Sequence, residues 1–142
     1  MISYPIVFKT NARAPSGIQT TWIEESQSIK TLCSIPQEFE GPGGGLSPED
    51  LFAQALSGCF LATFKVYAEK SRIEFDHISV QGELTVDLDE SKKPIMKKFI
   101  LNAEISGCSN LDRARSLAEK AFSSGFILNS VKTELSLNLS VS

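Results

Sequence analysis

The chain has 142 residues, of which 42% are hydrophobic and 22% are charged, and its net charge is −3. This length is enough to bury a core and corresponds to one domain, and the ordinary composition argues against a disordered chain. The mild acidity argues against general nucleic-acid binding, because neutralising phosphates requires clustered Lys and Arg. We therefore expect a single domain over residues 1–142 with no nucleic-acid partner.

Several further classes of protein are disfavoured by simple counts. No uninterrupted apolar run reaches the roughly 18 residues of a membrane span, and the N-terminus has no basic segment leading into an apolar one. Cys33, Cys59 and Cys108 are too widely spaced for a disulfide framework or a metal cluster, and the lone His77 completes no zinc site with them. We expect no metal, no membrane partner and, since free thiols persist in reducing compartments, a cytoplasmic location.

The N-terminal part is predicted to hold short strands at about residues 2–35. Apolar residues alternate loosely from Ile2 to Phe8, and the segment from Arg13 to Gly17 has the composition of a turn. Two short strands are expected at about Ile18–Ile23 and Ile29–Ile35, where Thr and Trp22 supply β-propensity. A glycine-rich loop, with flexible backbone, then leads into a helix.

The central helix is predicted at about residues 47–70. Ser47 can cap its first turn, Pro48 suits the first helical position, and Glu49 and Asp50 favour the positive end of the helix dipole. The following residues are apolar on nearly every face, so the helix must be covered all round. One sheet covers only one side, and the rest requires another helix or another subunit.

The second half has cleaner patterning. Period-two alternation predicts strands at about 76–106 with a turn at Asp89–Pro94, and again a last strand at about 131–142. An amphipathic helix is expected at about 111–124, with Gly125 as its stop. Two helices grouped against antiparallel strands indicate the α+β class.

Cys59 lies in the middle of the apolar central helix and is the leading candidate for chemistry. A buried free cysteine commonly behaves as a small hydrophobic residue and is inert. To react, Cys59 needs a cation that stabilises its thiolate, yet the nearest basic residue along the helix is Lys65, six positions on. The sequence alone leaves both interpretations open, with any activator coming from elsewhere in the fold.

Glu49 and Arg13 are the other candidates. Ten residues of helix separate Glu49 from Cys59, about 15 Å at the rise of an α-helix, so the two cooperate only if Glu49 comes from a second subunit. Glu49 can equally serve only the helix dipole. Arg13 in its turn is either simply solvated or able to bridge a carboxylate and a thiolate with its planar fork of donors.

The other motifs give weaker evidence for a function. The run Gly41–Gly45 matches neither a phosphate-binding loop nor a dinucleotide fingerprint, because the residues that follow such loops are absent. Ser57-Gly58-Cys59 lacks the Gly-x-Ser-x-Gly pattern of hydrolases, and His77 opens a strand. A hydrolase with Cys59 as nucleophile therefore lacks a convincing base.

The segment from Gly43 to Phe60 resembles the signature of the OsmC/Ohr family, the osmotically inducible and organic hydroperoxide resistance proteins. In that signature a glycine-rich loop precedes Asn/Ser-Pro-Glu, and a Cys-Phe pair follows ten positions after the glutamate, matching Glu49 and Cys59. The resemblance implies an α+β, intertwined homodimer with the central helices packed at the interface and the active sites between subunits. It also implies thiol-dependent reduction of organic hydroperoxides by Cys59, with Arg13 as activating arginine, no bound cofactor and an external dithiol reductant.

One departure from the family pattern is decisive. The family's second element is a helix ending in Cys-Pro-x-Ser-Asn/Gln-x-Leu/Val-Lys, and here Asn129, Val131 and Lys132 are retained while Gly125 stands in the place of the resolving cysteine. The sulfenate would then be resolved by an external thiol in a one-cysteine cycle, or by one of the other two cysteines, which are otherwise structural. The alternative is a catalytically inactive family dimer that binds an apolar ligand or acts as a stress-associated module.

Overall fold

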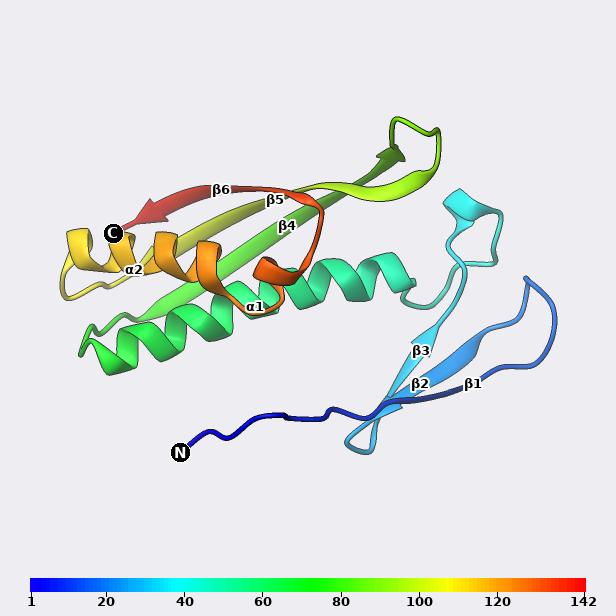
Figure 1. Cartoon of the computed structure of the whole chain (residues 1–142), viewed down its shortest axis with the longest axis horizontal. Coiled ribbons are helices and arrows are strands. Elements are labelled where there is room, and N and C mark those ends of the chain that lie inside the picture. The colour runs from blue at the N-terminus through cyan, green and yellow to red at the C-terminus, as the bar shows by residue number, and fades with distance from the viewer. The chain divides into compact units, whose positions relative to one another are not determined.

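The computed structural model describes all residues from Met1 to Ser142, and the chain divides into two compact units, Met1–Leu51 and Phe52–Ser142. Helix α1 (Pro48–Lys70) begins in the first unit and runs on into the second. Two helices and two three-stranded sheets make the fold α+β, which confirms the predicted class (Figure 1). The single-domain and homodimer expectations remain predictions.

The first unit contains an antiparallel sheet in the order β1-β2-β3. Its strands are β1 (Asn11–Arg13), β2 (Trp22–Ser26) and β3 (Ile29–Cys33), followed by the 3-10 turn η1 (Gln37–Phe39).

Two N-terminal expectations differ from this sheet. Residues 1–10 form no strand, although their apolar residues alternate. The second strand begins at Trp22 rather than at Ile18, because Gly17 adopts a φ of 104° and the Thr20 hydroxyl donates to the Gly17 carbonyl at 2.7 Å. This turn keeps the preceding segment out of the sheet.

The glycine-rich loop is joined to β3 and the residues after it by backbone hydrogen bonds. Leu46 donates to the Leu32 carbonyl at 2.9 Å and accepts from Ser34 at 3.1 Å, and Gly43 donates to the Ile35 carbonyl at 3.1 Å. A Cβ at Gly45 would lie 2.9 Å from the Leu32 carbonyl oxygen, so glycine permits this close approach.

Helix α1 begins with a reciprocal cap. The Asp50 amide donates to the Ser47 hydroxyl at 3.0 Å, while the Asp50 carboxylate accepts from the Ser47 amide and hydroxyl, both at 2.9 Å. These bonds satisfy donors that the first helical turn leaves without partners. The predicted start of the helix is confirmed, with Asp50 contributing to the cap as well as to the dipole.

The sheet of the second unit has the order β4-β5-β6, formed by β4 (His77–Leu88), β5 (Pro94–Ser106) and β6 (Glu134–Val141). β4 pairs with β5 antiparallel, as expected for a hairpin. β5 pairs with β6 in parallel, so the expectation of wholly antiparallel sheets is wrong for this pair. The reason is α2 (Leu111–Ser124), which carries the chain back along the sheet before β6 begins.

In this unit α1 and α2 lie along one face of the sheet (Figure 1), and the core forms between them and β5. The core residues of α1 recur every four positions, and those of α2 and β5 follow helical and alternating spacing. They are Leu56, Phe60, Phe64 and Ala68 of α1, Leu117, Ala118 and Ala121 of α2, and Phe99, Leu101, Ala103 and Ile105 of β5.

The apolar composition of α1 exceeds what this core requires. Although no uninterrupted apolar run is long enough, α1 contains an 18-residue window of mean hydropathy 1.3, sufficient by length and composition to cross a membrane. The core helix of a soluble protein passes the same test, and 22% of the window is buried within the chain. The composition of α1 is therefore weak evidence for a membrane span.

Candidate functional site

Cys59 is half-buried near the middle of α1, next to the fully buried Phe60. Its Sγ accepts a hydrogen bond from the backbone N–H of Ile127 at 3.3 Å. The Thr63 hydroxyl, one helical turn further on, lies 4.0 Å from the same sulfur. The sulfur is thus in contact with a polar backbone group, not sealed among hydrocarbon side chains.

The turn that brings Ile127 to the sulfur is fixed by its own backbone bonds. Gly125 donates to the Ala121 carbonyl at 2.9 Å, and its carbonyl accepts from Asn129 at 2.8 Å. The chain continues into the 3-10 turn η2 (Leu128–Ser130), whose Leu128 is buried in the core. These contacts hold the Ile127 amide in place against α1.

Side chains also join the end of α2 to α1. The Tyr67 hydroxyl and the Ser124 hydroxyl lie 2.7 Å apart, and the Ser124 hydroxyl also donates to the Lys120 carbonyl at 2.6 Å. The Lys120 ammonium lies 4.9 Å from the centre of the Tyr67 ring, a cation–π distance. Sequence reasoning did not identify these residues, which fix the position of the turn that follows Ser124.

Gly125 lies directly against the candidate thiol. A Cβ built at this position would lie 2.8 Å from the Cys59 Sγ. Position 125, where the resemblance leads us to expect a second cysteine, therefore lies within the reach of Cys59 that a disulfide requires.

The other two thiols have different surroundings. Cys33 is fully buried at the end of β3, and burial together with the nearby charge of Glu24 raises its pKa. Burial and the charge of Asp76 likewise raise the pKa of Cys108, whose thiol points to the Ile105 carbonyl at 3.9 Å. Both shifts keep these groups protonated, as expected for structural thiols.

Glu49 and Arg13 belong to the first unit, whereas Cys59 belongs to the second. Glu49 is the half-buried second residue of α1, ten residues before Cys59. Arg13 is exposed at the end of β1 and pairs with Ile23 in the sheet. It lines an open hollow of about 800 Å³ that Lys30 also lines. Their participation with Cys59 remains a prediction.

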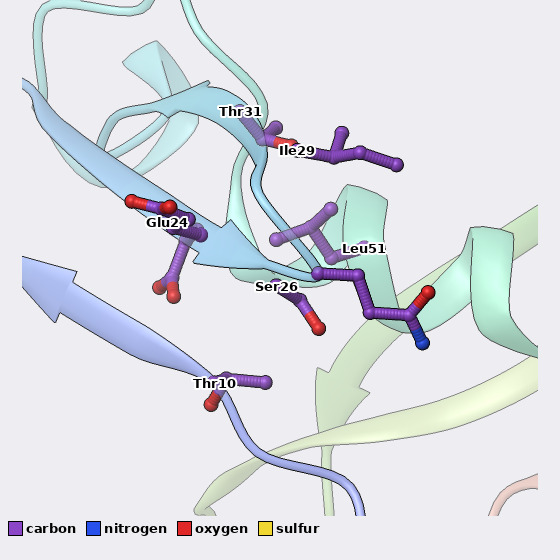
Figure 2. A pocket seen from close by; sticks show the side chains of 8 residues that line it. Thr10, Glu24, Ser26, Ile29, Thr31 and Leu51 are labelled. Atoms are coloured by element: carbon purple, nitrogen blue, oxygen red, sulfur yellow. The ribbon is translucent and has the colours of Figure 1, made fainter.

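A second hollow of the first unit, of about 420 Å³, contains none of the predicted site residues (Figure 2). Glu24, at its wall, accepts a hydrogen bond from the Trp22 indole at 3.1 Å. The complete lining is Thr10, Glu24, Glu25, Ser26, Gln27, Ile29, Thr31 and Leu51. With no thiol, histidine or cation at its wall, this hollow has no group for the chemistry predicted from the sequence.

The remaining candidates for chemistry stay apart from the thiol. His77 is exposed at the first position of β4, where it pairs with Ser106, and no hydrogen bond joins it to a cysteine. Nor do three or more His, Cys, Asp or Glu side chains gather in an arrangement that could hold a metal ion. The arrangement of residues at Cys59 therefore offers thiol chemistry, with a backbone donor on the sulfur.

Comparison with known proteins agrees with this fold. The family model described as OsmC-like protein matches residues 41–140. YmaD, an uncharacterized protein of Bacillus subtilis, is 26% identical over 139 residues, covering 95% of this chain and 93% of the relative. An organic hydroperoxide resistance protein of Xanthomonas axonopodis pv. citri is 28% identical over 83 residues, covering 58% of this chain and 55% of the relative.

Solved structures show the same architecture. An organic hydroperoxide resistance protein OsmC from Legionella pneumophila aligns with a TM-score of 0.74 and 27% identity, covering 97% of this chain and 99% of that one. An OsmC-like protein of unknown function from Vibrio cholerae aligns with a TM-score of 0.78 and 22% identity, covering 94% and 99%. The family model spans both the loop before α1 and the turn after α2. The chain therefore belongs to the OsmC-like family.

Proposed function

We propose that this chain reduces organic hydroperoxides, using Cys59 as the attacking thiol in a one-cysteine cycle. The observation that carries the proposal is the half-buried Cys59 sulfur, which accepts a backbone N–H at 3.3 Å and lies against Gly125. A donor aimed at a sulfur favours its anionic form, which is the nucleophile. Relatives named as organic hydroperoxide resistance proteins support the substrate class.

The first half of the cycle oxidises Cys59. Its thiolate attacks the terminal oxygen of the hydroperoxide, an S–O bond forms and the O–O bond breaks. The alkoxide leaves as an alcohol after taking a proton, and the sulfur becomes a sulfenic acid. The peroxide is reduced by two electrons, and the sulfur is oxidised by the same two.

The second half requires an external thiol, because Gly125 supplies no sulfur. That thiol condenses with the sulfenic acid, releasing water and leaving a mixed disulfide with Cys59. A second thiol, or the other thiol of a dithiol, displaces Cys59 and leaves as a disulfide. The other two cysteines of the chain are poor resolving groups, since burial raises the pKa of Cys33 and of Cys108.

The complete site would include a second copy of the chain. One helix spans about 15 Å between Glu49 and Cys59, so a cooperating Glu49 comes from a partner's α1. A homodimer would also cover faces of α1 that the core of its own unit leaves exposed, such as Val66, which is 47% exposed. Arg13 would supply the cation that holds the anionic sulfur and the peroxide.

Hydroperoxide consumption with a small dithiol tests the proposal. The purified protein should consume cumene hydroperoxide when dithiothreitol or a dihydrolipoyl donor is supplied, and Cys59→Ser should fall to the background rate. Cys108→Ser is the matched control, because it removes a thiol from the same unit, and it should keep the wild-type rate. Equal rates for wild type and Cys59→Ser would rule out the peroxidase and leave a non-catalytic, ligand-binding family member.

The role of Arg13 has a separate test. Arg13→Ala should lower hydroperoxide consumption by about a hundredfold, the usual cost of removing a donor that stabilises developing charge. Lys30→Ala removes a cation from the wall of the same hollow and should leave the rate near wild type. If both variants keep the wild-type rate, Arg13 is not the activating cation and another positive group must serve.

A further inference from the structure

Gly125 has an ordinary backbone conformation, so its φ and ψ angles do not require glycine. Its φ of −55° and ψ of 138° are accessible to any residue, unlike the φ of 70° at Gly107. The clearance around its Cα is unusual instead. A Cβ at this position would lie 2.8 Å from the Cys59 Sγ, closer than such atoms approach in proteins. The Ala121 carbonyl oxygen and the Leu128 Cδ1 would each lie 3.1 Å from the same Cβ, so the sulfur is the nearest of three atoms that leave little space for a side chain at position 125.

That placement is what brings the sulfur to a backbone donor. Resting against Gly125, the Cys59 Sγ lies 3.3 Å from the Ile127 nitrogen and accepts its N–H. One residue, Phe126, separates Gly125 from Ile127, whose amide donates to the sulfur. A residue with a Cβ at position 125 would push the sulfur away and lengthen or break this bond.

We propose that Gly125 is a positioning residue that seats the Cys59 sulfur on the turn, where the Ile127 amide stabilises its anionic form. This inference rests on the proposed function of Cys59 and names residues that would tune its reaction. Hydrogen bonds to a charged acceptor are about twice as strong as neutral ones, so the amide favours the thiolate over the thiol. The same donor can then hold the oxidised sulfur until an external thiol arrives.

The geometry also sets a cysteine at position 125 against the present hydrogen bond between the reduced Cys59 sulfur and the Ile127 amide. A cysteine at position 125 would bring a resolving thiol, but its Cβ would lie 2.8 Å from the present position of the Cys59 Sγ, so the reduced sulfur would have to move. The glycine removes the internal resolving group and, in the same step, admits the sulfur to the Ile127 amide. Glycine at position 125 thus removes a resolving thiol and also changes how the Cys59 sulfur is positioned.

The test compares substitutions that disturb the contacts of the Cys59 sulfur with Gly125 and the Ile127 amide with substitutions that leave these contacts intact. Gly125→Ala adds only the clashing Cβ, and Ile127→Pro removes the N–H at a residue whose φ of −73° suits proline. Ile127→Ala changes the exposed side chain and keeps the N–H. Ser123→Ala, an exposed position in the last turn of α2, is the control for the helix end.

The readout is the rate at which iodoacetamide alkylates Cys59 across pH, followed site by site with mass spectrometry, beside hydroperoxide consumption. Gly125→Ala and Ile127→Pro should each slow Cys59 alkylation at neutral pH by about tenfold and move its rise to higher pH. Ile127→Ala and Ser123→Ala should match wild type. Thermal unfolding shows whether each variant is folded.

The outcomes separate this inference from the proposed function. Wild-type alkylation profiles in both Gly125→Ala and Ile127→Pro would overturn it, even if the protein consumes hydroperoxide normally. If the alkylation profiles of both variants shift to higher pH but wild type consumes no hydroperoxide, the positioning role of Gly125 is supported and the peroxidase proposal fails. Should Gly125→Ala fail to fold, the difference between Ile127→Pro and Ile127→Ala decides, because only one of them keeps the amide.

Discussion

Cys59 and Cys33 are both free thiols on regular elements, one in the middle of α1 and the other at the end of β3. Cys33 is fully buried, and this burial together with the negative charge of Glu24 raises the pKa of its thiol. Cys59 is half-buried and accepts an N–H from a turn 68 residues later in the chain. Burial and a neighbouring carboxylate disfavour the thiolate of Cys33, whereas the Cys59 sulfur has a hydrogen-bond donor.

Cys108 completes the comparison within the second unit. It follows the left-handed Gly107, near Asp76, and its raised pKa has the same causes as that of Cys33, burial and a carboxylate. The sequence singles out Cys59 by its motif, but it does not show which groups the fold places beside each sulfur. The difference arises from what the fold brings to each sulfur, a carboxylate in two cases and a backbone amide in the third.

The strongest way to sharpen this comparison is to give Cys59 a covalent partner. Gly125→Cys should form an internal disulfide with Cys59 after one equivalent of hydroperoxide, because position 125 lies within disulfide reach of the sulfur. The oxidised protein should lose two hydrogens in mass, and peptide mapping should join residues 59 and 125. Reagents that trap sulfenic acids should then label Cys59 in wild type but not in Gly125→Cys.

Ser123→Cys is the matched control for that experiment. It places a thiol two residues away, at an exposed position in the last turn of α2 where the present hydroxyl donates to the Lys120 carbonyl. Internal bridging in Ser123→Cys, or its absence in Gly125→Cys, would contradict the placement of the turn against α1.

Much of this fold followed from residue patterns alone. Ser47, Pro48 and Asp50 predicted the start of α1, and the amphipathic spacing after Asn110 predicted α2, because caps and periodicity are local properties. The parallel pairing of β5 with β6 did not follow, since period-two alternation is the same in either direction. The direction of β6 depends on the crossover through α2.

In the candidate site, too, some features could be predicted from the sequence and others depend on tertiary packing. The choice of Cys59 as candidate and the departure at position 125 could both be predicted from the sequence, since both depend on a motif and its spacing. The contact between the Ile127 amide and the sulfur was not, because any non-proline residue carries an N–H and only tertiary packing aims it. The Tyr67–Ser124 hydroxyl pair that fixes the end of α2 is equally invisible, as serine and tyrosine are common on helices.

A second way to test the comparison is the order in which the three thiols react in the native protein. At neutral pH, iodoacetamide should modify Cys59 at least about tenfold faster than Cys108 or Cys33, since only thiolates react and the raised pKa values keep those two protonated. Their rates should climb only as the pH rises above about 9, the ordinary value from which both are raised. In denaturant all three should react alike. A native protein in which Cys33 or Cys108 reacts first would break the comparison.

The smallest expected effect concerns the second polar neighbour of the sulfur. Thr63→Val removes the hydroxyl 4.0 Å from the Cys59 Sγ while nearly preserving shape, and Thr63→Ser keeps the hydroxyl. Because a contact at that distance is weak, Thr63→Val should change Cys59 alkylation by less than about threefold. A tenfold loss in Thr63→Val, restored in Thr63→Ser, would instead make the helix hydroxyl the main donor. The turn after α2 would then contribute clearance through Gly125 and little charge stabilisation through Ile127.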